Sequence, residues 1–216
     1  MIKIYAIVLA AGYATRLHPL TEDIPKPLLE VAGKPIMEHI IHKFENLNIN
    51  KIYIVINDKF YQNFSDWLHN FDAKTPIEII NDGTKSNEDR LGAMGDIHFV
   101  VKNKNIKEDL VVIAGDNLFE VSLQEVANIF NKRKKNLIVL HDVKDKELAR
   151  HYGVVEVKDN VIIDFEEKPV SPKSTLVSTG IYFFPKKTLG LIEKYVSQGN
   201  NLDKTGDFIK WLYKRE

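Results

Sequence analysis

The sequence predicts an α/β fold, in which an open, mostly parallel, Rossmann-like sheet carries helices on both faces and a small antiparallel β lobe is attached. Over the first two thirds of the chain, short apolar runs alternate with segments of helical apolar spacing. After about residue 150, strands follow one another closely and are joined by turn residues. The chain has 216 residues, 44% of them hydrophobic, which is enough for one sizeable core. We therefore expect one domain over residues 1–216, with a core at 1–150 and a lobe at 151–216.

The core is predicted to contain five strands and four helices. The first strand, residues 4–9, is continuously apolar, which is typical of a strand buried on both faces. The other expected strands cover residues 51–56, 77–80, 110–114 and 137–143. Helical spacing predicts helices over residues 36–47, 59–70, 91–101 and 122–130. Ser122 and Glu125 form a capping box for the last of them, and the polar segment 81–89 is expected to be a loop.

The lobe is predicted to begin with a hairpin. Strands over residues 154–157 and 161–165 are separated by the turn-like triplet Lys158-Asp159-Asn160. A third strand, residues 178–184, ends at Pro185. Helices are expected over residues 186–197 and 208–214.

Composition excludes several classes of protein. Thirty basic and thirty acidic residues give a formal net charge of zero, whereas a protein that grips a nucleic-acid backbone usually has a basic surplus. The absence of cysteine excludes a disulfide scaffold, a zinc–thiolate site and a thiol nucleophile. The apolar start is too short to span a bilayer and follows one lysine, Lys3, so no signal peptide is expected. We expect a soluble cytoplasmic protein without nucleic-acid or membrane partners, and the sequence does not indicate its oligomeric state.

The segment after the first strand has residues suited to binding phosphate. Ala10, Ala11 and Gly12 have small or absent side chains, so the backbone can approach a flat base or a phosphate closely. Arg16 offers a planar fork of donors, and Lys26 stands between two prolines that stiffen its segment. The alternative is a surface loop with an ordinary arginine and lysine. The segment matches neither Gly-x-Gly-x-x-Gly nor a P-loop, which disfavours a nicotinamide dehydrogenase and a P-loop NTPase.

Two further strand ends carry charged side chains. Asp116 lies just after strand 110–114, where a carboxylate can bind Mg²⁺ together with substrate phosphates. The alternative for Asp116 is a turn or a cap for the next helix. Glu167 and Lys168 end another strand, where a carboxylate can accept hydrogen bonds from sugar hydroxyls while a lysine holds a phosphate. The alternative for this pair is edge-strand charge that discourages aggregation.

Together these segments resemble the sugar-1-phosphate nucleotidyltransferases, the family of nucleoside-diphosphate-sugar pyrophosphorylases. The resemblance covers nearly the whole chain and rests on ordered motifs at residues 9–21, 25–36, 115–117, 152–156, 166–169 and 178–182. It implies a glycosyltransferase-A-like nucleotidyltransferase fold, with the nucleotide on the core and the sugar phosphate on the lobe. It also implies a Mg²⁺-dependent reaction in which an oxygen of a sugar 1-phosphate attacks the α-phosphorus of a nucleoside triphosphate. Pyrophosphate leaves directly, without a covalent enzyme intermediate.

The resemblance assigns roles to residues of this sequence. The nucleotide would contact Leu9, Ala11, Gly12, Gly83 and Thr84, of which the last two lie in a loop that helps to select the base. Three residues would serve the reaction: Arg16 at the leaving pyrophosphate, Lys26 between the reacting phosphates, and Asp116 at Mg²⁺. The acceptor would contact Asn117, Gly153, Glu167, Lys168 and Thr179, with Lys168 at the phosphate.

The sequence departs from the family pattern at three places. Ala14 replaces a common glycine, and the polar loop 81–92 prevents any inference about the base. Many relatives continue into a Trp-x-Asp-Ile-Gly segment whose aspartate completes the metal site, whereas this sequence stops at Glu216. We expect either that Asp203 or Asp207 substitutes or that the chain is a C-terminally short or truncated form.

Two alternative functions remain at this point. The first keeps the chemistry but uses a non-sugar acceptor such as phosphocholine or inositol phosphate, usually with CTP. The second is a catalytically weak regulatory protein that binds a nucleotide sugar, and the missing C-terminal segment is the reason to consider it.

Overall fold

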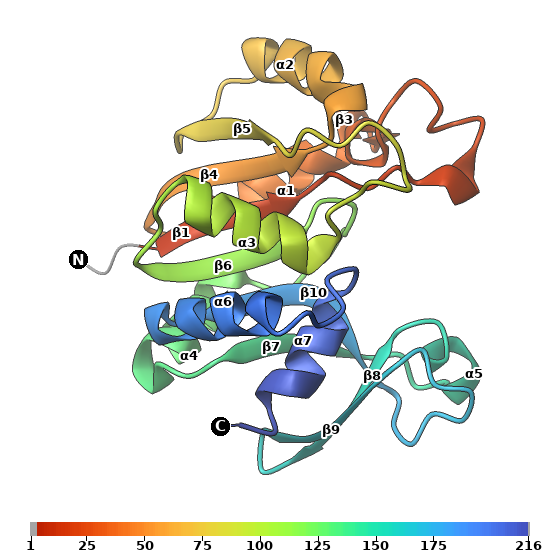
Figure 1. The fold of residues 1–216 in the computed structure, drawn as a ribbon, viewed down its shortest axis with the longest axis vertical. Helices are drawn as coiled ribbons and strands as arrows, with labels where there is room; N and C mark the ends of the chain where they lie inside the picture. Colours follow the sequence, from red (N-terminus) through yellow and green to blue (C-terminus); the bar gives the residue numbers. More distant parts are fainter. Residues whose placement is uncertain (1–3, 216) are drawn as a thin grey trace.

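The computed structural model, which describes residues 4–215, has the α/β fold that the sequence predicts (Figure 1). Eight strands form one sheet in the order β5-β4-β1-β6-β10-β8-β9, with β7 paired to β10. The strands of the core are β1 (Ile4–Leu9), β4 (Ile49–Ile56), β5 (Ile77–Asn81), β6 (Asp109–Ala114) and β7 (Leu137–Asp142). The later strands are β8 (Gly153–Lys158), β9 (Val161–Glu167) and β10 (Leu176–Phe184). A separate small hairpin pairs β2 (Glu30–Val31) with β3 (Lys34–Pro35).

Strand order reverses at the centre of the sheet. β1 pairs in parallel with β4, and β4 pairs in parallel with β5, so the first strands after β1 are added on one side of it. β6 then pairs in parallel with the other side of β1, where Leu9 lies opposite Ala114. In open parallel sheets, ligands bind beyond the carboxyl ends of the strands at such a reversal. The loops after β1 and β6 are therefore the candidate ligand-binding loops.

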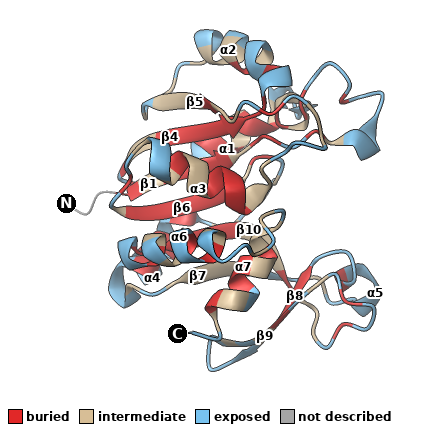
Figure 2. Cartoon of the chain, viewed as in Figure 1, coloured by how far each residue is buried: buried red, intermediate tan, exposed pale blue. Residues whose placement is uncertain are grey.

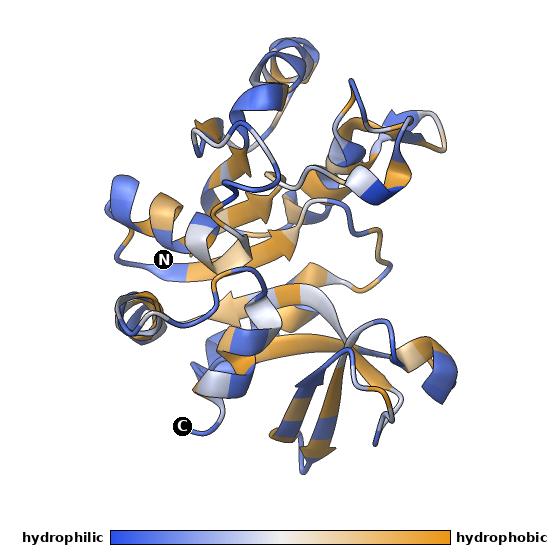
Figure 3. Cartoon of the chain, turned by 45° about the vertical axis from the view of Figure 1, so that its right-hand side comes forward, coloured by the Kyte–Doolittle hydropathy of each residue, from blue (hydrophilic) through white to orange (hydrophobic). Residues whose placement is uncertain are grey.

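Helices cover both faces of the sheet. One hydrophobic cluster joins the sheet to α1 (Ile36–Phe44), α2 (Tyr61–Asn70) and α4 (Leu123–Arg133). The cluster on the other face joins it to α3 (Ala93–Asn103), α6 (Leu189–Ser197) and α7 (Thr205–Leu212). Neighbouring residues of β1 alternate between the faces, with Ala6 and Val8 in the first cluster and Ile7 in the second. Figure 2 shows this double burial as red central strands, and Figure 3 shows the same strands as mostly hydrophobic.

The final strand belongs to the large sheet as well as to the lobe. The sequence analysis grouped the strand over 178–184 with the antiparallel lobe, and β10 does pair antiparallel with β8. It also pairs antiparallel with β6 and β7, and it thereby lies between them in the sheet. An apolar run of this length does not disclose its partners, because pairing is decided by contacts distant in sequence. The division of the chain at residue 150 stays a prediction.

Two short elements were missed by the sequence analysis, namely the β2–β3 hairpin and α5 (Lys146–Ala149). Their few residues give too little periodicity to detect. The predicted hairpin turn is present, since Lys158 pairs with Val161 and the two residues between them have φ angles of 52° and 59°. Within residues 4–215, the helices are all too short or too polar to cross a bilayer.

We expect Gly115→Ala to lower the free energy of unfolding by about 1–3 kcal/mol, the usual range for overpacking. A Cβ at Gly115 would lie 2.7 Å from the carbonyl oxygen of Leu9, and backbone cannot move away as a flexible side chain can. The matched control is Gly190→Ala in α6, where a Cβ meets nothing within 4 Å. Because alanine favours helix, that control should gain up to about 1 kcal/mol. Urea denaturation of both variants measures the difference, and equal stabilities would show that the β1–β6 contact is looser than described.

Candidate active site

The loops after β1 and β6 leave the sheet in backbone contact. The amide of Gly115 donates to the carbonyl oxygen of Leu9 at 2.8 Å, and the amide of Ala10 donates to that of Val55 at 2.9 Å. Ala10 and Ala11 are buried, whereas Gly12 is exposed and has open space where a Cβ would be. The small residues therefore let two loops meet at the point where strand order reverses.

A lysine and an aspartate form an ion pair at this end of the sheet, just after β6. Lys26 Nζ lies 2.6 Å from Asp116 Oδ2, although the residues are 90 positions apart in the sequence. Lys26 begins a 3-10 turn (Lys26–Leu28) after Pro25, and the buried Pro27 anchors that turn to the core. The two side chains are 33% and 46% exposed, so a ligand can reach both. Because surface ion pairs contribute little to stability, such a pair can rearrange around an incoming ligand at small cost.

Arg16 extends from a second short turn, Thr15–Leu17. The preceding residue, Ala14, has a left-handed backbone with φ +48°, and its carbonyl oxygen accepts a hydrogen bond of 2.8 Å from Thr21 Oγ1. Ala14 therefore occupies a conformation that glycine adopts more easily. Arg16 itself is exposed, and within residues 4–215 it forms no hydrogen bond or ion pair with another predicted site residue.

Asn57 fixes the loop after β1 and was missed by the sequence analysis. Its side chain is fully buried, and its Nδ2 donates to the carbonyl oxygen of Ala11 at 2.9 Å. Its Oδ1 accepts a hydrogen bond from the amide of Phe60 at 3.1 Å, which caps the turn before α2. The available signal was a polar residue immediately after the apolar strand β4, a signal shared by many ordinary caps.

The loop that follows β5 is tied to the same segment. Tyr13 donates through its hydroxyl to Thr84 Oγ1 at 3.2 Å, and Thr84 donates through its hydroxyl to Asp82 Oδ1 at 2.7 Å. The carbonyl oxygen of Thr84 accepts from the amide of Asp58 at 2.8 Å. Thr84 is buried, while the neighbouring Gly83 is exposed with φ +81°. Burial raises the pKa of Tyr13, so its hydroxyl stays a donor.

Two of the five predicted acceptor residues, Asn117 and Thr179, meet at β10. Asn117 donates through Nδ2 to the carbonyl oxygen of Thr179, which joins the loop after β6 to β10. Thr179 in turn donates through Oγ1 to the carbonyl oxygen of Val139 at 2.8 Å. Gly180 follows with φ +74°, and the pairing of β10 with β7 shifts register there. Asp116, Asn117 and Thr179 are therefore held at one place by adjoining strands.

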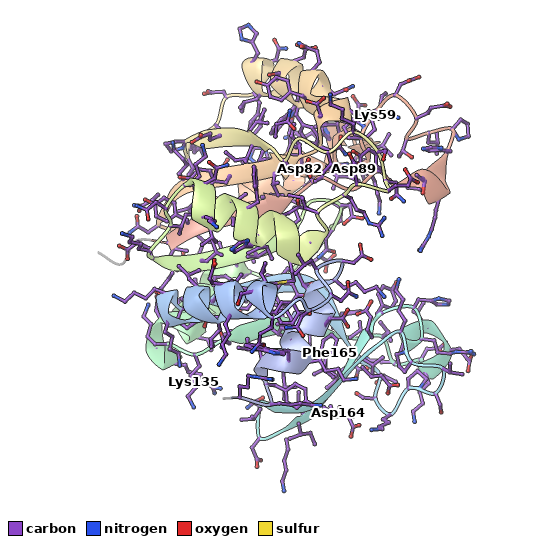
Figure 4. The ribbon with its side chains drawn as sticks, viewed as in Figure 1. Lys59, Asp82, Asp89, Lys135, Asp164 and Phe165 are labelled. Atoms are coloured by element: carbon purple, nitrogen blue, oxygen red, sulfur yellow. The ribbon has the colours of Figure 1, made fainter. Side chains whose placement is uncertain are left out.

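The carboxylate of Glu167 packs against two glycines, Gly153 of β8 and Gly206 at the start of α7. A Cβ at Gly153 would lie 3.1 Å from Glu167 Oε2, and a Cβ at Gly206 would lie 2.6 Å from it. Lys204 Nζ is 3.8 Å from Glu167 Oε1. Phe165, labelled in Figure 4 beside α7, closes the other side of both glycines. Neither Lys204 nor Gly206 was identified from the sequence, because no motif marks the segment before α7.

The chain bends at Lys168. This residue has φ +48°, and its amide donates to the carbonyl oxygen of Tyr152 at 3.0 Å. The bend means that simple strand alternation does not decide where the side chain lies. Among the described residues, Lys168 has no hydrogen bond or ion pair with Glu167 or the other predicted site residues.

The carboxylate of Asp116 is of a kind that can hold a magnesium ion when phosphates supply further ligands. Mg²⁺ usually keeps several waters and binds through one or two carboxylates plus substrate phosphates. Within residues 4–215, no cluster of three or more acidic or histidine side chains is arranged to hold a metal. The two other candidate carboxylates have local partners: Asp203 Oδ1 accepts from Arg90 Nε at 2.9 Å, and Asp207 Oδ2 accepts from Asn201 Nδ2 at 2.8 Å. Of the three, Asp116 is the one at the strand-order reversal.

Comparisons with known proteins agree with the fold and with the predicted family. Residues 5–215 match the family model described as nucleotidyl transferase. The bifunctional protein GlmU of Methanocaldococcus jannaschii is 36% identical over 212 residues, covering 98% of this chain and 47% of that protein. The UTP–glucose-1-phosphate uridylyltransferase AglF of Haloferax volcanii is 33% identical over 183 residues, covering 83% of this chain and 71% of that protein. The chain thus spans about half the length of GlmU relatives and most of AglF.

Solved structures confirm the architecture. A UDP-glucose pyrophosphorylase complexed with UDP-glucose superimposes with a TM-score of 0.81 at 22% identity, covering 100% of this chain and 88% of that one. A UTP-bound UGPase from Acinetobacter baumannii gives a TM-score of 0.78 at 20% identity, covering 100% and 84% respectively. At these identities the likeness establishes the fold.

We expect Asn57→Ala to lower the free energy of unfolding by about 1–3 kcal/mol, since the amide of Phe60 and the carbonyl oxygen of Ala11 would both be left without a partner. The matched control is Asn70→Ala, which removes an exposed side chain bonded only to its own helix. Thermal unfolding of the two variants tests this. If Asn57→Ala were as stable as its control, Asn57 would not hold the loop.

Proposed function

This chain belongs to the nucleotidyl transferase family, and on that premise we propose that it joins a nucleoside triphosphate to a sugar 1-phosphate, forming a nucleoside-diphosphate sugar and pyrophosphate. One observation carries the proposal. Lys26 and Asp116 are in contact at the reversal of strand order, where two backbones approach each other and both side chains remain accessible. A cation and a carboxylate at this place suit a reaction between phosphate groups.

The reaction is a direct displacement. An oxygen of the sugar 1-phosphate forms a bond to the α-phosphorus of the triphosphate, and the bond from that phosphorus to the bridging oxygen of the β-phosphate breaks. Both electrons of the broken bond leave with pyrophosphate. The protein's task is to align two anionic substrates and to neutralise their charge. Lys26 would lie between the reacting phosphates, and Arg16 would bind the leaving pyrophosphate with its fork of donors.

Asp116 would hold the magnesium ion on which we propose the reaction depends. When bound, Mg²⁺ supplies charge neutralisation at the phosphate oxygens. The carboxylate of Asp116 is accessible enough to hold such an ion, and Lys26 is accessible enough to contact a phosphate. The short connection from β6 to Asp116 keeps this carboxylate at the end of the sheet.

A sugar phosphate is the acceptor that the site favours. Glu167, held between Gly153 and Gly206, can accept hydrogen bonds from hydroxyl groups, and Thr179 with Asn117 lines the approach from β10. Choline would instead require an aromatic cage for its quaternary ammonium. The relative AglF is named for glucose 1-phosphate, which also favours a sugar.

Pyrophosphate release should occur with one pair of substrates in the presence of Mg²⁺. The assay combines ATP, CTP, GTP, UTP and dTTP in turn with a panel of sugar 1-phosphates and with phosphocholine and inositol phosphate. Pyrophosphate release with a sugar 1-phosphate supports the proposal. Release only with phosphocholine or inositol phosphate would show that the acceptor is not a sugar phosphate. Nucleotide-sugar binding without any release would instead support the regulatory form.

Lys26→Ala and Asp116→Asn should each lower kcat/KM by at least about 100-fold, the loss seen when one group that stabilises a transition-state charge is removed. Lys135→Ala and Asp72→Asn change the same residue types at exposed positions away from the site and should keep full activity. Circular dichroism checks that all four variants fold. Near-normal turnover in either site variant would contradict the roles given to Lys26 and Asp116.

Gly206→Ala should raise the KM for the sugar phosphate while leaving that for the nucleoside triphosphate unchanged. A Cβ at this position would lie 2.6 Å from Glu167 Oε2 and 2.9 Å from Phe165, so the carboxylate must move. Gly190→Ala again serves as the control. A rise confined to the nucleotide KM would show that Glu167 does not serve the acceptor.

A further inference from the structure

Two carboxylates that the proposed reaction does not use lie close to each other where the loop after β5 begins, and each has one oxygen shielded from solvent. Asp82 directly follows β5, and Asp96 lies in the first turn of α3 with only 6% of its surface exposed. Figure 4 labels Asp82 and Asp89, which both belong to this loop. Asp82 Oδ2 and Asp96 Oδ1 are both shielded from solvent, and neither accepts a hydrogen bond from a donor group. Two ionised carboxylates in this state would be costly, because burial without a donor is unfavourable for each and they repel.

A single proton resolves both problems. If Asp96 is neutral, its carboxyl O–H can donate to Asp82, and Asp82 Oδ2 then has the hydrogen-bond partner that it otherwise lacks. Burial, and secondarily the charge of Asp82, raise the pKa of Asp96 from 3.8 to about 8. The proton is then retained at neutral pH.

The other oxygen of Asp82 holds the loop. Asp82 Oδ1 accepts from the amide and from the hydroxyl of Thr84, both at 2.7 Å. Thr84 Oγ1 accepts in turn from the hydroxyl of Tyr13 at 3.2 Å. Every donor in this hydrogen-bond network then has one acceptor. Asp96 and Thr84 donate to Asp82, and Tyr13 donates to Thr84. The network connects α3 to the residue next to Gly12.

The groups around the pair do not neutralise a second negative charge. Asp58, after β4, and Asp89, in the same loop, act with Asp82 to raise the pKa of Tyr13, although less than burial does. Two basic side chains of α3 and of this loop have other partners: His98 is bonded to Glu193 of α6, and Arg90 is bonded to Asp203. The pair therefore depends on its own proton.

We propose that Asp96 is a positioning residue for the nucleotide: its neutral carboxyl group donates to Asp82 and thereby holds the 82–84 loop on Tyr13 and the Gly12 segment. This inference rests on the proposed function, since it places the nucleoside triphosphate at that loop. Ionisation of Asp96 removes the donor and adds a charge, so the loop loosens and nucleotide affinity falls as pH rises.

The pair also makes stability depend on pH in a defined direction. The carboxyl group of Asp96 ionises near pH 3.8 in the unfolded chain but near pH 8 in the folded one. Between these values the unfolded state binds fewer protons, so stability present below pH 4 is lost progressively as pH rises to about 8. Asp96→Asn cannot ionise, and its amide can donate to Asp82 at every pH.

The test compares wild type, Asp96→Asn, Asp96→Ala and the exposed control Asp72→Asn between pH 6 and 9.5. Isothermal titration calorimetry with ATP, CTP, GTP, UTP and dTTP first identifies the nucleotide that binds. Its Kd should rise about tenfold per pH unit above pH 8 in wild type and the control. In Asp96→Asn it should stay near the low-pH wild-type value, and in Asp96→Ala it should be raised at least several-fold at every pH.

Urea denaturation of the same proteins from pH 5 to 8 supplies a readout that needs no ligand. The unfolding equilibrium constant of wild type should rise relative to Asp96→Asn by up to tenfold per pH unit. Parallel stability profiles would overturn the proposal, because Asp96 would then be ionised like an ordinary aspartate. The stability profiles of wild type and Asp96→Asn could instead diverge while the nucleotide Kd responds neither to pH nor to Asp96→Ala. That outcome would overturn the positioning role. Failure of the proposed function gives a different pattern, in which pH-dependent nucleotide binding persists and no acceptor releases pyrophosphate.

Discussion

The contact between the carboxyl ends of β1 and β6 is the constraint on which the site depends. Parallel pairing brings Leu9 opposite Ala114, and the amide of Gly115 then bonds to the carbonyl oxygen of Leu9. No side chain fits between them, as the 2.7 Å separation from a Cβ at Gly115 shows. Because the strands are buried on both faces, their ends cannot shift independently. The loop with Gly12 and the loop with Asp116 therefore leave the sheet at fixed relative positions.

Because the strand ends are rigid, the charged side chains of Lys26 and Asp116 need not contribute to folding. The Lys26–Asp116 pair is a third to a half exposed, so water screens it and it contributes little to folding. The backbone under it is secured in other ways, with Pro27 buried beneath Lys26 and β6 buried beneath Asp116. Such an arrangement leaves two opposite charges accessible at the end of the sheet without making the fold depend on them.

Strands were predictable from the sequence where burial on both faces gives continuous apolar runs, and β1 and β6 were predicted within one residue of their bounds. The place of Asp116 at the carboxyl end of β6 was predictable too, because it follows a clear apolar run, whereas its role stays a proposal. Two kinds of information were not accessible. β10 was not recognised as a neighbour of β6, because its partners are distant in the sequence. Asn57 and Asp96 were missed, because their importance comes from burial and partners rather than from a motif.

The loop between β5 and α3 shows how a polar segment can be ordered without an apolar core. Asp89 accepts from the amides of Lys85 and Ser86, and these hydrogen bonds hold the pKa of its carboxyl below the ordinary value. At the end of the loop, a Cβ on Gly92 would lie 2.6 Å from the backbone of the 202–203 segment. The carbonyl oxygens of that segment accept hydrogen bonds from the first amides of α3, those of Ala93 and Met94. Three residues further along, Gly206 lies against Glu167. Residues 202–206, which lead into the first turn of α7, therefore contact both the end of the β5–α3 loop and the Glu167 carboxylate, so one stretch of backbone touches both.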